Sequence, residues 1–205
     1  MKATAGSRRT RLAPEVRRDL ILDATAALIL EGGLSAVSME RVATRVAVSK
    51  GLIYNYFPTR DDLLAALLRR EQNELRERGL ASALEAESFE ALIRQTTRLY
   101  LEQTRDRGAM ISALLSDPSV AALMEDDIRN DRERTFRYFV RAARREFNLP
   151  LPLAMAAVDL LSTVTGQAGL HVARKQMDVG PATEICVELI LGGLSRLDPG
   201  RSPRD

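Results

Sequence analysis

Residues 38–63, SMERVATRVAVSKGLIYNYFPTRDDL, decide the fold of the N-terminal part of the chain. Ser38 and Ser49 each stand directly before a short run of helix-forming residues, where a serine side chain can cap the first free N–H groups. Pro58 biases the residue before it away from helical backbone, so the second run ends there. Two short helices with a tight turn near Ala47 are therefore expected, which is the layout of a helix-turn-helix.

The residue types within these two helices fit that layout. Small or apolar side chains are needed where the helices touch, and they occur at Val42, Ala43, Val46, Val48, Leu52 and Ile53. Polar side chains are needed at the front of the second helix, which enters the DNA major groove, and they occur at Ser49, Lys50 and Asn55. Gly51 in so short a helix costs about 1 kcal/mol relative to alanine. A close approach of its backbone to DNA would offset that cost.

The pattern outside this segment is also helical, without strand-like alternation. One helix precedes it over 15–32, ended by two glycines, and Thr59 with Asp62 has the spacing of a capping box for the next helix. Further helices are expected over 88–106, 110–115, 117–147, 152–175 and 180–197. The sequence therefore predicts an all-α protein. A three-helix DNA-binding domain at 15–60 precedes a six-helix ligand-binding and dimerisation bundle at 61–197, with a disordered basic arm at 1–14 and a flexible tail at 198–205.

Composition and charge fit a DNA-binding protein of the cytoplasm. Hydrophobic residues make up 45% and charged residues 28% of the 205 positions, as in a soluble globular protein. Residues 1–60 hold ten Lys and Arg against five Asp and Glu, whereas 61–205 hold twenty against twenty-three. This asymmetry favours a polyanionic partner at the basic end. The single cysteine, Cys186, fits a reducing compartment, and the N-terminus lacks the apolar stretch of a signal peptide.

The helix expected at 152–175 is apolar on nearly every side. Asp159 is the only formally charged residue between Glu146 and Arg174, and the stretch is long enough to cross a bilayer. The serine, threonine and glutamine residues within it favour instead a helix shared between the core and a dimer interface.

The run VSKGLIYNYFPTRDDL at 48–63 resembles the DNA-binding domain of the tetracycline-repressor (TetR/AcrR) family. It matches the family pattern Val-Ser-x-Gly-x-(Leu/Ile)-Tyr-x-x-Phe-x-x-(Lys/Arg)-x-x-Leu at all eight defined positions. The resemblance covers about 15–65, and the remaining residues agree with the family in being helical. It implies a homodimeric transcriptional repressor that binds a palindromic operator and is released by a small effector.

The resemblance also implies which side chains contact DNA. Ser49 and Lys50 would face phosphates and base edges, and Tyr54 and Tyr56 would donate to phosphates. Asn55 would read a base edge, because its amide suits adenine. The full set of implied DNA-binding residues is Ser38, Arg45, Ser49, Lys50, Gly51, Leu52, Tyr54, Asn55, Tyr56 and Arg60. Arg8, Arg9 and Arg11 of the basic arm would reach the minor groove.

Two positions depart from the family pattern. Ala47 stands where the family usually has glycine, so a turn with positive φ there carries a penalty of about 1 kcal/mol. Asn55 and Tyr56 stand where the family often has an aromatic residue followed by histidine. Base preference therefore does not carry over by analogy. Phe57 is expected in the core.

The helical body is expected to hold the effector and the dimer interface. The residues favoured as pocket lining are Tyr100, Met110, Phe136, Phe139, Asp159, Thr163 and Gln167, which suit a largely apolar effector. For Asp159, an exposed position is an equal alternative. The last two helices are expected to form the dimer, where Gly166, Gly169, Gly192 and Gly193 permit close approach.

Two other classes of function stay open at this point. One is a DNA-binding protein without an effector, and the other is a helical small-molecule-binding protein or enzyme. His171, the single histidine, has no catalytic or metal-ligating partner at a recognisable spacing. No catalytic residue, metal site or cofactor is therefore predicted, and the expected partners are double-stranded DNA, a small effector and a second copy of the chain.

Overall fold

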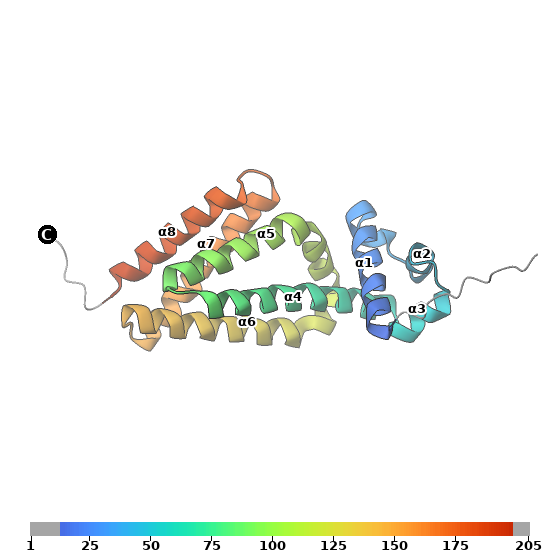
Figure 1. Ribbon diagram of the computed structural model, residues 1–205, viewed down its shortest axis with the longest axis horizontal. Helices are drawn as coiled ribbons and strands as arrows, with labels where there is room; N and C mark the ends of the chain where they lie inside the picture. The colour runs from blue at the N-terminus through green and yellow to red at the C-terminus, as the bar shows by residue number, and fades with distance from the viewer. Residues whose placement is uncertain (1–12, 199–205) are drawn as a thin grey trace, which may run out of the picture. The chain divides into compact units, whose positions relative to one another are not determined.

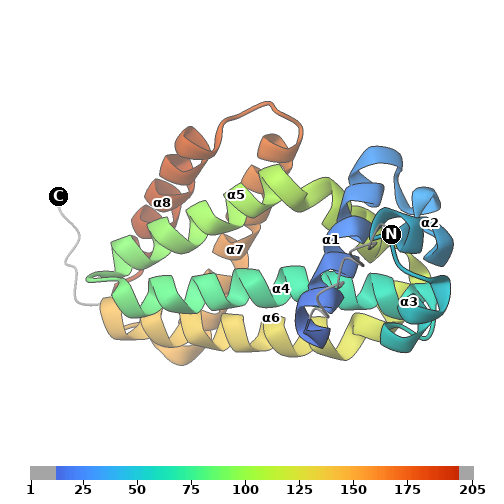
Figure 2. The same cartoon turned by 45° about the vertical axis from the view of Figure 1, so that its right-hand side comes forward.

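The computed structural model describes residues 13–198. Within that range every regular element is helical, which confirms the predicted all-α class. The chain divides into two compact units, one ending at Leu67 and the other beginning at Leu68. Helix α4 (Arg60–Glu85) begins in the first unit and continues in the second (Figures 1 and 2). Residues 1–12 of the predicted basic arm, with Arg8, Arg9 and Arg11, lie outside the described residues, whereas Pro14, assigned to the arm, is the first residue of α1.

The N-terminal unit contains three helices and a short 3-10 turn before α4. They are α1 (Pro14–Gly32), η1 (Leu34–Ala36), α2 (Met39–Arg45) and α3 (Lys50–Tyr56). Helix α1 packs against α2, and α2 packs against α3. Fully buried aliphatic side chains form the core of this unit: Ile21, Leu22, Val42, Ile53 and Leu63. The predicted helix-turn-helix is thus formed by α2 and α3.

The C-terminal unit contains the rest of α4 and four further helices. They are α5 (Phe89–Ser116), α6 (Pro118–Phe147), α7 (Leu151–Ala173) and α8 (Val179–Arg196). Helix α5 packs against α6, α7 and α8, with a core that includes Leu92, Ile93, Val187 and Leu194. Helices α4 and α6 run side by side in both ribbon views (Figures 1 and 2). They are joined by the ion pairs Arg69–Asp127 at 2.7 Å and Arg76–Asp131 at 3.2 Å.

The bundle has five helices among the described residues, one fewer than predicted. The helices expected at 88–106 and 110–115 are one continuous helix, α5. Gly108 lies inside this helix, because one glycine in a helix costs only about 1 kcal/mol. Met110 and Leu114 are buried like Leu101 before them, so the apolar side of α5 continues across the charged stretch between Leu101 and Met110 and holds the helix together.

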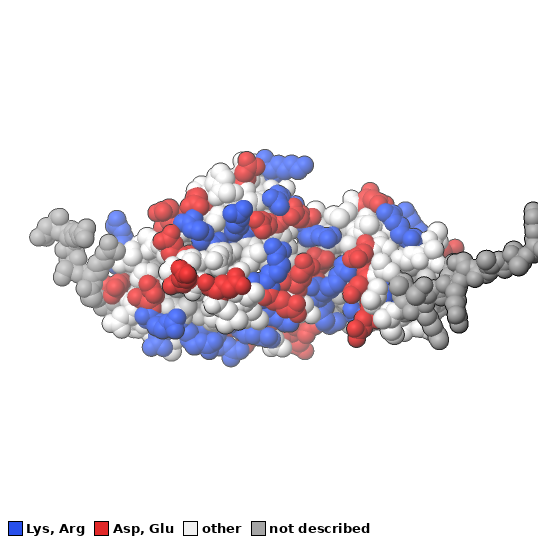
Figure 3. All heavy atoms as spheres, in the orientation of Figure 1, with Lys and Arg blue, Asp and Glu red and all other residues white. Residues whose placement is uncertain are grey.

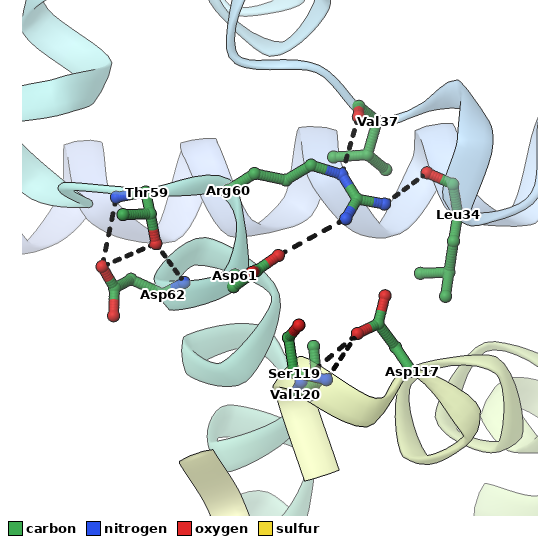
Figure 4. Close-up of polar contacts among 9 residues, drawn as sticks. All are labelled: Leu34, Val37, Thr59, Arg60, Asp61, Asp62, Asp117, Ser119 and Val120. Atoms are coloured by element: carbon green, nitrogen blue, oxygen red, sulfur yellow. Dashed lines mark hydrogen bonds and ion pairs between the residues drawn. The ribbon is translucent and has the colours of Figure 1, made fainter. Parts of the chain in front are cut away.

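The predicted helix starts are confirmed by their caps. The Ser38 and Ser49 hydroxyls accept from backbone N–H groups three residues ahead. Thr59 and Asp62 form a reciprocal capping box: the Thr59 N–H donates to Asp62 at 3.1 Å, and the Asp62 N–H donates to Thr59 Oγ1 at 3.0 Å (Figure 4). Asp117 caps α6 by accepting from two N–H groups of its first turn. These local signals depend only on neighbouring residues, which is why the sequence revealed them.

Helix α7 is apolar but poorly covered by its own chain. By length and composition it could cross a membrane, and only 22% of its most apolar 18-residue stretch is buried. Leu160 is 68% exposed, and Leu189 on α8 is 52% exposed. Apolar side chains of this size on two adjoining helices are typical of a surface that another molecule covers.

Candidate nucleic-acid interface

The turn between α2 and α3 is closed by backbone hydrogen bonds. The Val48 N–H donates to the Ala43 carbonyl at 3.0 Å, and the Ala47 N–H donates to Thr44 at 3.2 Å. Ala47 has a φ of +55°, in the left-handed region. The turn therefore needs positive φ at the position where glycine was expected, and its Cβ carries the predicted penalty of about 1 kcal/mol.

Helix α3 has one buried side and one exposed polar side. Ile53 is completely buried and fixes the helix on the core of the N-terminal unit. Lys50, Gly51, Tyr54 and Asn55 share the exposed side, and Tyr54 is 44% exposed despite its aromatic ring. Beyond its own helix, no atom of the described residues lies within 4 Å of where a Cβ at Gly51 would stand, so packing among them does not require glycine there. The exposed side therefore offers a cation, a phenol, an amide and bare backbone to a partner.

The hydroxyls of the two N-cap serines can also donate a hydrogen bond to a phosphate. Ser38 Oγ accepts from the Arg41 N–H at 3.2 Å, and Ser49 Oγ accepts from the Leu52 N–H at 3.2 Å. Both residues are exposed. A hydroxyl that accepts a hydrogen bond still has its own proton to donate. Capping and phosphate binding are thus compatible at both positions.

Leu52, Tyr56 and Phe57 belong to the inner side of the motif. Leu52 and Tyr56 are half-buried, and Phe57 is 3% exposed, which confirms its predicted place in the core. The guanidinium carbon of Arg18 lies 5.3 Å from the centre of the Phe57 ring, in cation–π range. This contact links the residue after α3 to α1.

Arg45 lies at the end of α2 and is already paired. Its Nη1 donates to Glu31 Oε2 at 2.7 Å, and its Nη2 bonds the other carboxylate oxygen. This contact lowers the pKa of Glu31 below its ordinary value. Arg41, one helical turn earlier and also exposed, adds a second positive charge near Glu31. Sequence reasoning missed Arg41, although its spacing of four residues from Arg45 places both on one side of α2.

Arg60, at the start of α4, is held by contacts within the N-terminal unit. Its Nε donates to the Val37 carbonyl at 3.1 Å, its Nη2 donates to the Leu34 carbonyl at 2.9 Å, and Nη1 pairs with Asp61 at 3.5 Å (Figure 4). The side chain is only partly exposed. Arg60 thus ties the start of α4 to the loop before α2. Its predicted phosphate contact stays a prediction.

The predicted effector-pocket residues do not lie in one enclosed cavity. Asp159, Thr163 and Gln167 are exposed on α7, whereas Met110 is buried in α5. Phe136 and Phe139 pack against the main core of the C-terminal unit. A helical repeat alone does not distinguish a side that faces the core from one that faces another molecule. Asp159 has the exposed position that was its alternative, and Thr163 and Gln167 line an open groove rather than an enclosed cavity.

Tyr100 contacts α7 within the same chain. A Cβ at Gly169 would lie 3.1 Å from the Tyr100 ring, so this glycine makes room for the tyrosine. A Cβ at Gly193 would be in ordinary contact with Leu161 at 3.4 Å, whereas Gly166 and Gly192 face open space among the described residues. Gly166 and Gly192 therefore leave the most room for the close approach of a second copy.

An open apolar groove runs between α7 and α8, with a volume of about 490 Å³. Thr163, Gln167, His171 and Cys186 are among its lining residues. His171 Nδ1 lies 2.9 Å from Gln176 Oε1. Burial raises the pKa of the Cys186 thiol, which disfavours the reactive thiolate.

Comparison with known proteins identifies the family. Residues 21–67 match the family described as bacterial regulatory proteins, tetR family. The chain is also 33% identical over 187 residues to the HTH-type transcriptional repressor KstR of Rhodococcus jostii RHA1. This match covers 90% of this chain and 87% of that protein. The chain belongs to the tetR family of bacterial regulatory proteins.

Other members support the same assignment. The transcriptional repressor KstR of Mycolicibacterium smegmatis is 49% identical over 55 residues, which is 27% of each chain. A TetR-like transcriptional regulator from Rhodococcus sp. RHA1 superposes with a TM-score of 0.71 at 19% identity, covering 90% of this chain and 99% of that chain, so the two share a fold. The predicted family and the predicted function as a helix-turn-helix transcriptional regulator are confirmed.

Proposed function

We propose that this TetR-family regulator is a repressor that binds a palindromic operator as a homodimer and is released by a small molecule. The observation that carries the proposal is the exposed polar side of α3, formed by Lys50, Gly51, Tyr54 and Asn55 on a helix whose other side is anchored by buried Ile53. A short helix with a polar front and a fixed back is what major-groove recognition requires. Such a protein acts in the cytoplasm, where the operator DNA lies.

The proposed contacts are of two kinds: phosphate contacts that position α3 and a base contact that reads the sequence. Lys50 and Tyr54 contact phosphates, which fix the register of α3 without reading sequence. Asn55 reads a base edge, with adenine favoured by its amide geometry. Arg45 reaches a phosphate by exchanging its Glu31 partner for the DNA backbone. Arg60 supports these contacts indirectly, by holding the loop before α2.

The proposed dimer uses α7 and α8. Leu160 and Leu170 of α7 and Ile185 and Leu189 of α8 are each at least 46% exposed, although their helices are apolar. Covering them with a second copy removes this apolar surface from water. A two-fold axis there would present two α3 helices to half-sites one DNA turn, about 34 Å, apart or a multiple of it.

Sedimentation tests the dimer. Leu160→Glu with Leu189→Glu is expected to give a monomer that no longer binds a two-half-site duplex tightly. Leu84→Glu is the matched control, because Leu84 is 88% exposed on α4 and lies outside the proposed interface. A dimer that survives the double substitution would contradict this interface.

Selection from a library of randomised duplexes tests the operator. Enrichment of an inverted repeat is expected, and loss of enrichment with Lys50→Ala and Asn55→Ala is expected to follow. Binding without enrichment of any sequence would contradict a specific regulator and favour an architectural DNA-binding protein.

A further inference from the structure

The second half of α6 carries arginines without acidic residues between them. Residues 134–145 contain no aspartate or glutamate and five arginines, namely Arg134, Arg137, Arg141, Arg144 and Arg145. All five are exposed. Their spacings of three and four residues place them on one side of the helix. These five residues are called the basic face of α6 below.

The opposite side of this half of α6 is fixed on the core of the C-terminal unit. Val140 is 4% exposed, Ala143 is completely buried, and Phe136 and Phe139 pack against the same core. The basic face therefore points away from the bundle. In the space-filling view, basic side chains gather along the lower edge of this unit, where Figure 1 places α6 (Figure 3). The face is about 16 Å long, because a helix rises about 1.5 Å per residue.

Ion pairs neutralise only the first part of the basic face. Arg134 and Arg137 each have an acidic partner earlier on α6, at 3.4 Å and 4.0 Å. Exposed pairs of this kind are weak and are readily exchanged for another anion. Among the residues that the structure describes, no carboxylate pairs with Arg141 or Arg145.

The end of the helix explains two of the five arginines. Arg144 and Arg145 lie in the last turn of α6, where the helix dipole favours cations. Arg144 Nε also donates to the Leu149 carbonyl at 3.3 Å and so holds the chain after the helix. Neither reason applies to Arg134, Arg137 and Arg141, which lie in earlier turns. Their charge therefore needs another explanation.

The chemistry of the basic face suits phosphates. All of its cations are arginines, whose planar guanidinium groups bind phosphate through two parallel hydrogen bonds and are weakly hydrated. Each strand of duplex DNA carries one phosphate per about 3.4 Å of axis, so about five phosphates of one strand lie along 16 Å of axis. The length and charge of the face thus match a short segment of the DNA backbone.

A membrane surface is the other large polyanion, and the structure disfavours it. A helix that lies on a membrane inserts exposed apolar side chains between the lipids. Among the exposed large apolar side chains of the described residues, none lies between Met124 and Phe147. The apolar side of this half of α6 is instead buried in the core. DNA, which a helix-turn-helix regulator already binds, is therefore the favoured partner.

We propose that the basic face of α6 binds the phosphates of a second DNA segment, separately from α3 and without reading its sequence. This inference goes beyond the proposed function, because it needs neither a palindromic operator nor an effector. A duplex of operator length is held by α3, and the basic face is left for another duplex. A regulator with both surfaces joins two segments of DNA.

Anisotropy titrations with a duplex of unrelated sequence test the basic face by itself. The background protein carries Lys50→Ala and Tyr54→Phe, which remove the proposed contacts of α3. Adding Arg137→Gln, Arg141→Gln and Arg145→Gln is expected to weaken binding at least about tenfold at low salt. The slope of log affinity against log salt is expected to become shallower by about two to three, because each phosphate contact contributes about 0.9.

The matched control removes three other exposed arginines of the C-terminal unit, each paired with a carboxylate. It carries Arg98→Gln, Arg105→Gln and Arg129→Gln in the same background. Its affinity is expected to stay within about twofold of the background protein, because these charges are already neutralised. Equal weakening by both triple substitutions would mean that only net charge matters, which would overturn the proposal.

A second variant keeps the test decisive if the triple substitution does not fold. Arg141→Gln alone removes the central cation of the face and is expected to lower the salt slope by about 0.9. Circular dichroism melting shows which variants are folded. Unchanged affinity and slope in the folded basic-face variants would mean that DNA is bound elsewhere and would overturn the proposal.

Capture of a second duplex tests the two surfaces together. Wild-type protein on an immobilised selected duplex is expected to retain a labelled duplex of unrelated sequence at low salt. Arg137→Gln with Arg141→Gln and Arg145→Gln is expected to keep the selected duplex and lose the second one. No binding of any selected duplex would contradict the proposed function alone, whereas binding without capture would contradict the basic face alone.

Sedimentation with phosphatidylserine vesicles tests the membrane alternative. The wild-type protein is expected to stay in solution, as it does with phosphatidylcholine vesicles. Vesicle binding that the basic-face substitutions abolish, with the DNA titrations unchanged, would assign the face to anionic lipid and overturn the proposal.

Discussion

Arg45 at the end of α2 and Glu31 near the end of α1 form a two-pronged ion pair, with the guanidinium Nη1 2.7 Å from the carboxylate Oε2. Both side chains are exposed, so the pair adds little to stability at ordinary salt. Its consequence lies in recognition. The arginine that was expected to bind a phosphate is held by a carboxylate of its own domain, and DNA must compete with that carboxylate.

Glu31→Gln is therefore expected to strengthen DNA binding severalfold. The substitution frees Arg45 and removes a negative charge beside the proposed phosphate contacts. Fluorescence anisotropy with a selected duplex measures the effect, and Glu133→Gln on α6 controls for the change in net charge. Equal affinities for the two variants would contradict a phosphate contact by Arg45.

Ala47→Gly is expected to stabilise the N-terminal unit by about 1 kcal/mol, because Ala47 has a φ of +55° that glycine adopts without strain. Ala27→Gly in the interior of α1 is the control, and it is expected to lose about the same amount. Urea unfolding followed by circular dichroism measures both. The test is that Ala47→Gly raises the free energy of unfolding whereas Ala27→Gly lowers it. A loss of stability in both variants would mean that the turn does not require positive φ.

Arg60→Lys separates the two roles considered for Arg60. A lysine keeps the charge for a phosphate but does not reproduce the fork that bonds the Val37 and Leu34 carbonyls. A loss of about 1 kcal/mol in the free energy of unfolding is expected, because Arg60 is partly exposed and two hydrogen bonds weaken. Unchanged stability of Arg60→Lys would contradict the structural role of Arg60 and favour the phosphate contact.

Glu71 makes the folded protein less stable as the pH rises. Burial raises its pKa in the folded protein above the ordinary value of 4.5. The folded state therefore favours the protonated acid, and this contribution is present below 4.5 and lost as pH rises through the raised pKa. Glu71→Gln mimics the neutral acid. The free energy of unfolding of Glu71→Gln is expected to match that of the wild type near pH 4 and to exceed it near pH 7.

Urea unfolding of the two proteins at both pH values checks this, with Glu133→Gln as the exposed control. A wild type more stable than Glu71→Gln near pH 7 would mean that Arg70 and Arg107 more than compensate the buried charge.

The N-terminal unit was largely predictable because its signals are local. Ser38, Ser49 and the Thr59–Asp62 pair cap helices through residues at most three positions away. Ala47 was recognised as the strained position because it stands where the resembled family usually has glycine. The contacts of Arg60 were not predictable, because its carbonyl partners lie 23 and 26 residues earlier, in a loop whose path the sequence does not reveal.

The C-terminal unit was less predictable because its surfaces depend on packing. Thr163 and Gln167 lie on an apolar helix, yet they are exposed and line the open groove between α7 and α8, which depends on how these two helices pack. Glu71 was not singled out, although it continues the buried stripe of Leu64, Leu67 and Leu68 at helical spacing. A carboxylate inside such a stripe is the signal that would have found it.

The central claim is that the exposed side of α3 recognises DNA, and one measurement tests it most directly. Anisotropy titrations of duplexes flanking the protein's own gene, across a salt series, compare wild type with Lys50→Ala combined with Tyr54→Phe. We predict nanomolar, sequence-selective binding that weakens steeply with salt and is lost in the double variant. Weak binding that is indifferent to sequence and to both substitutions would contradict the claim.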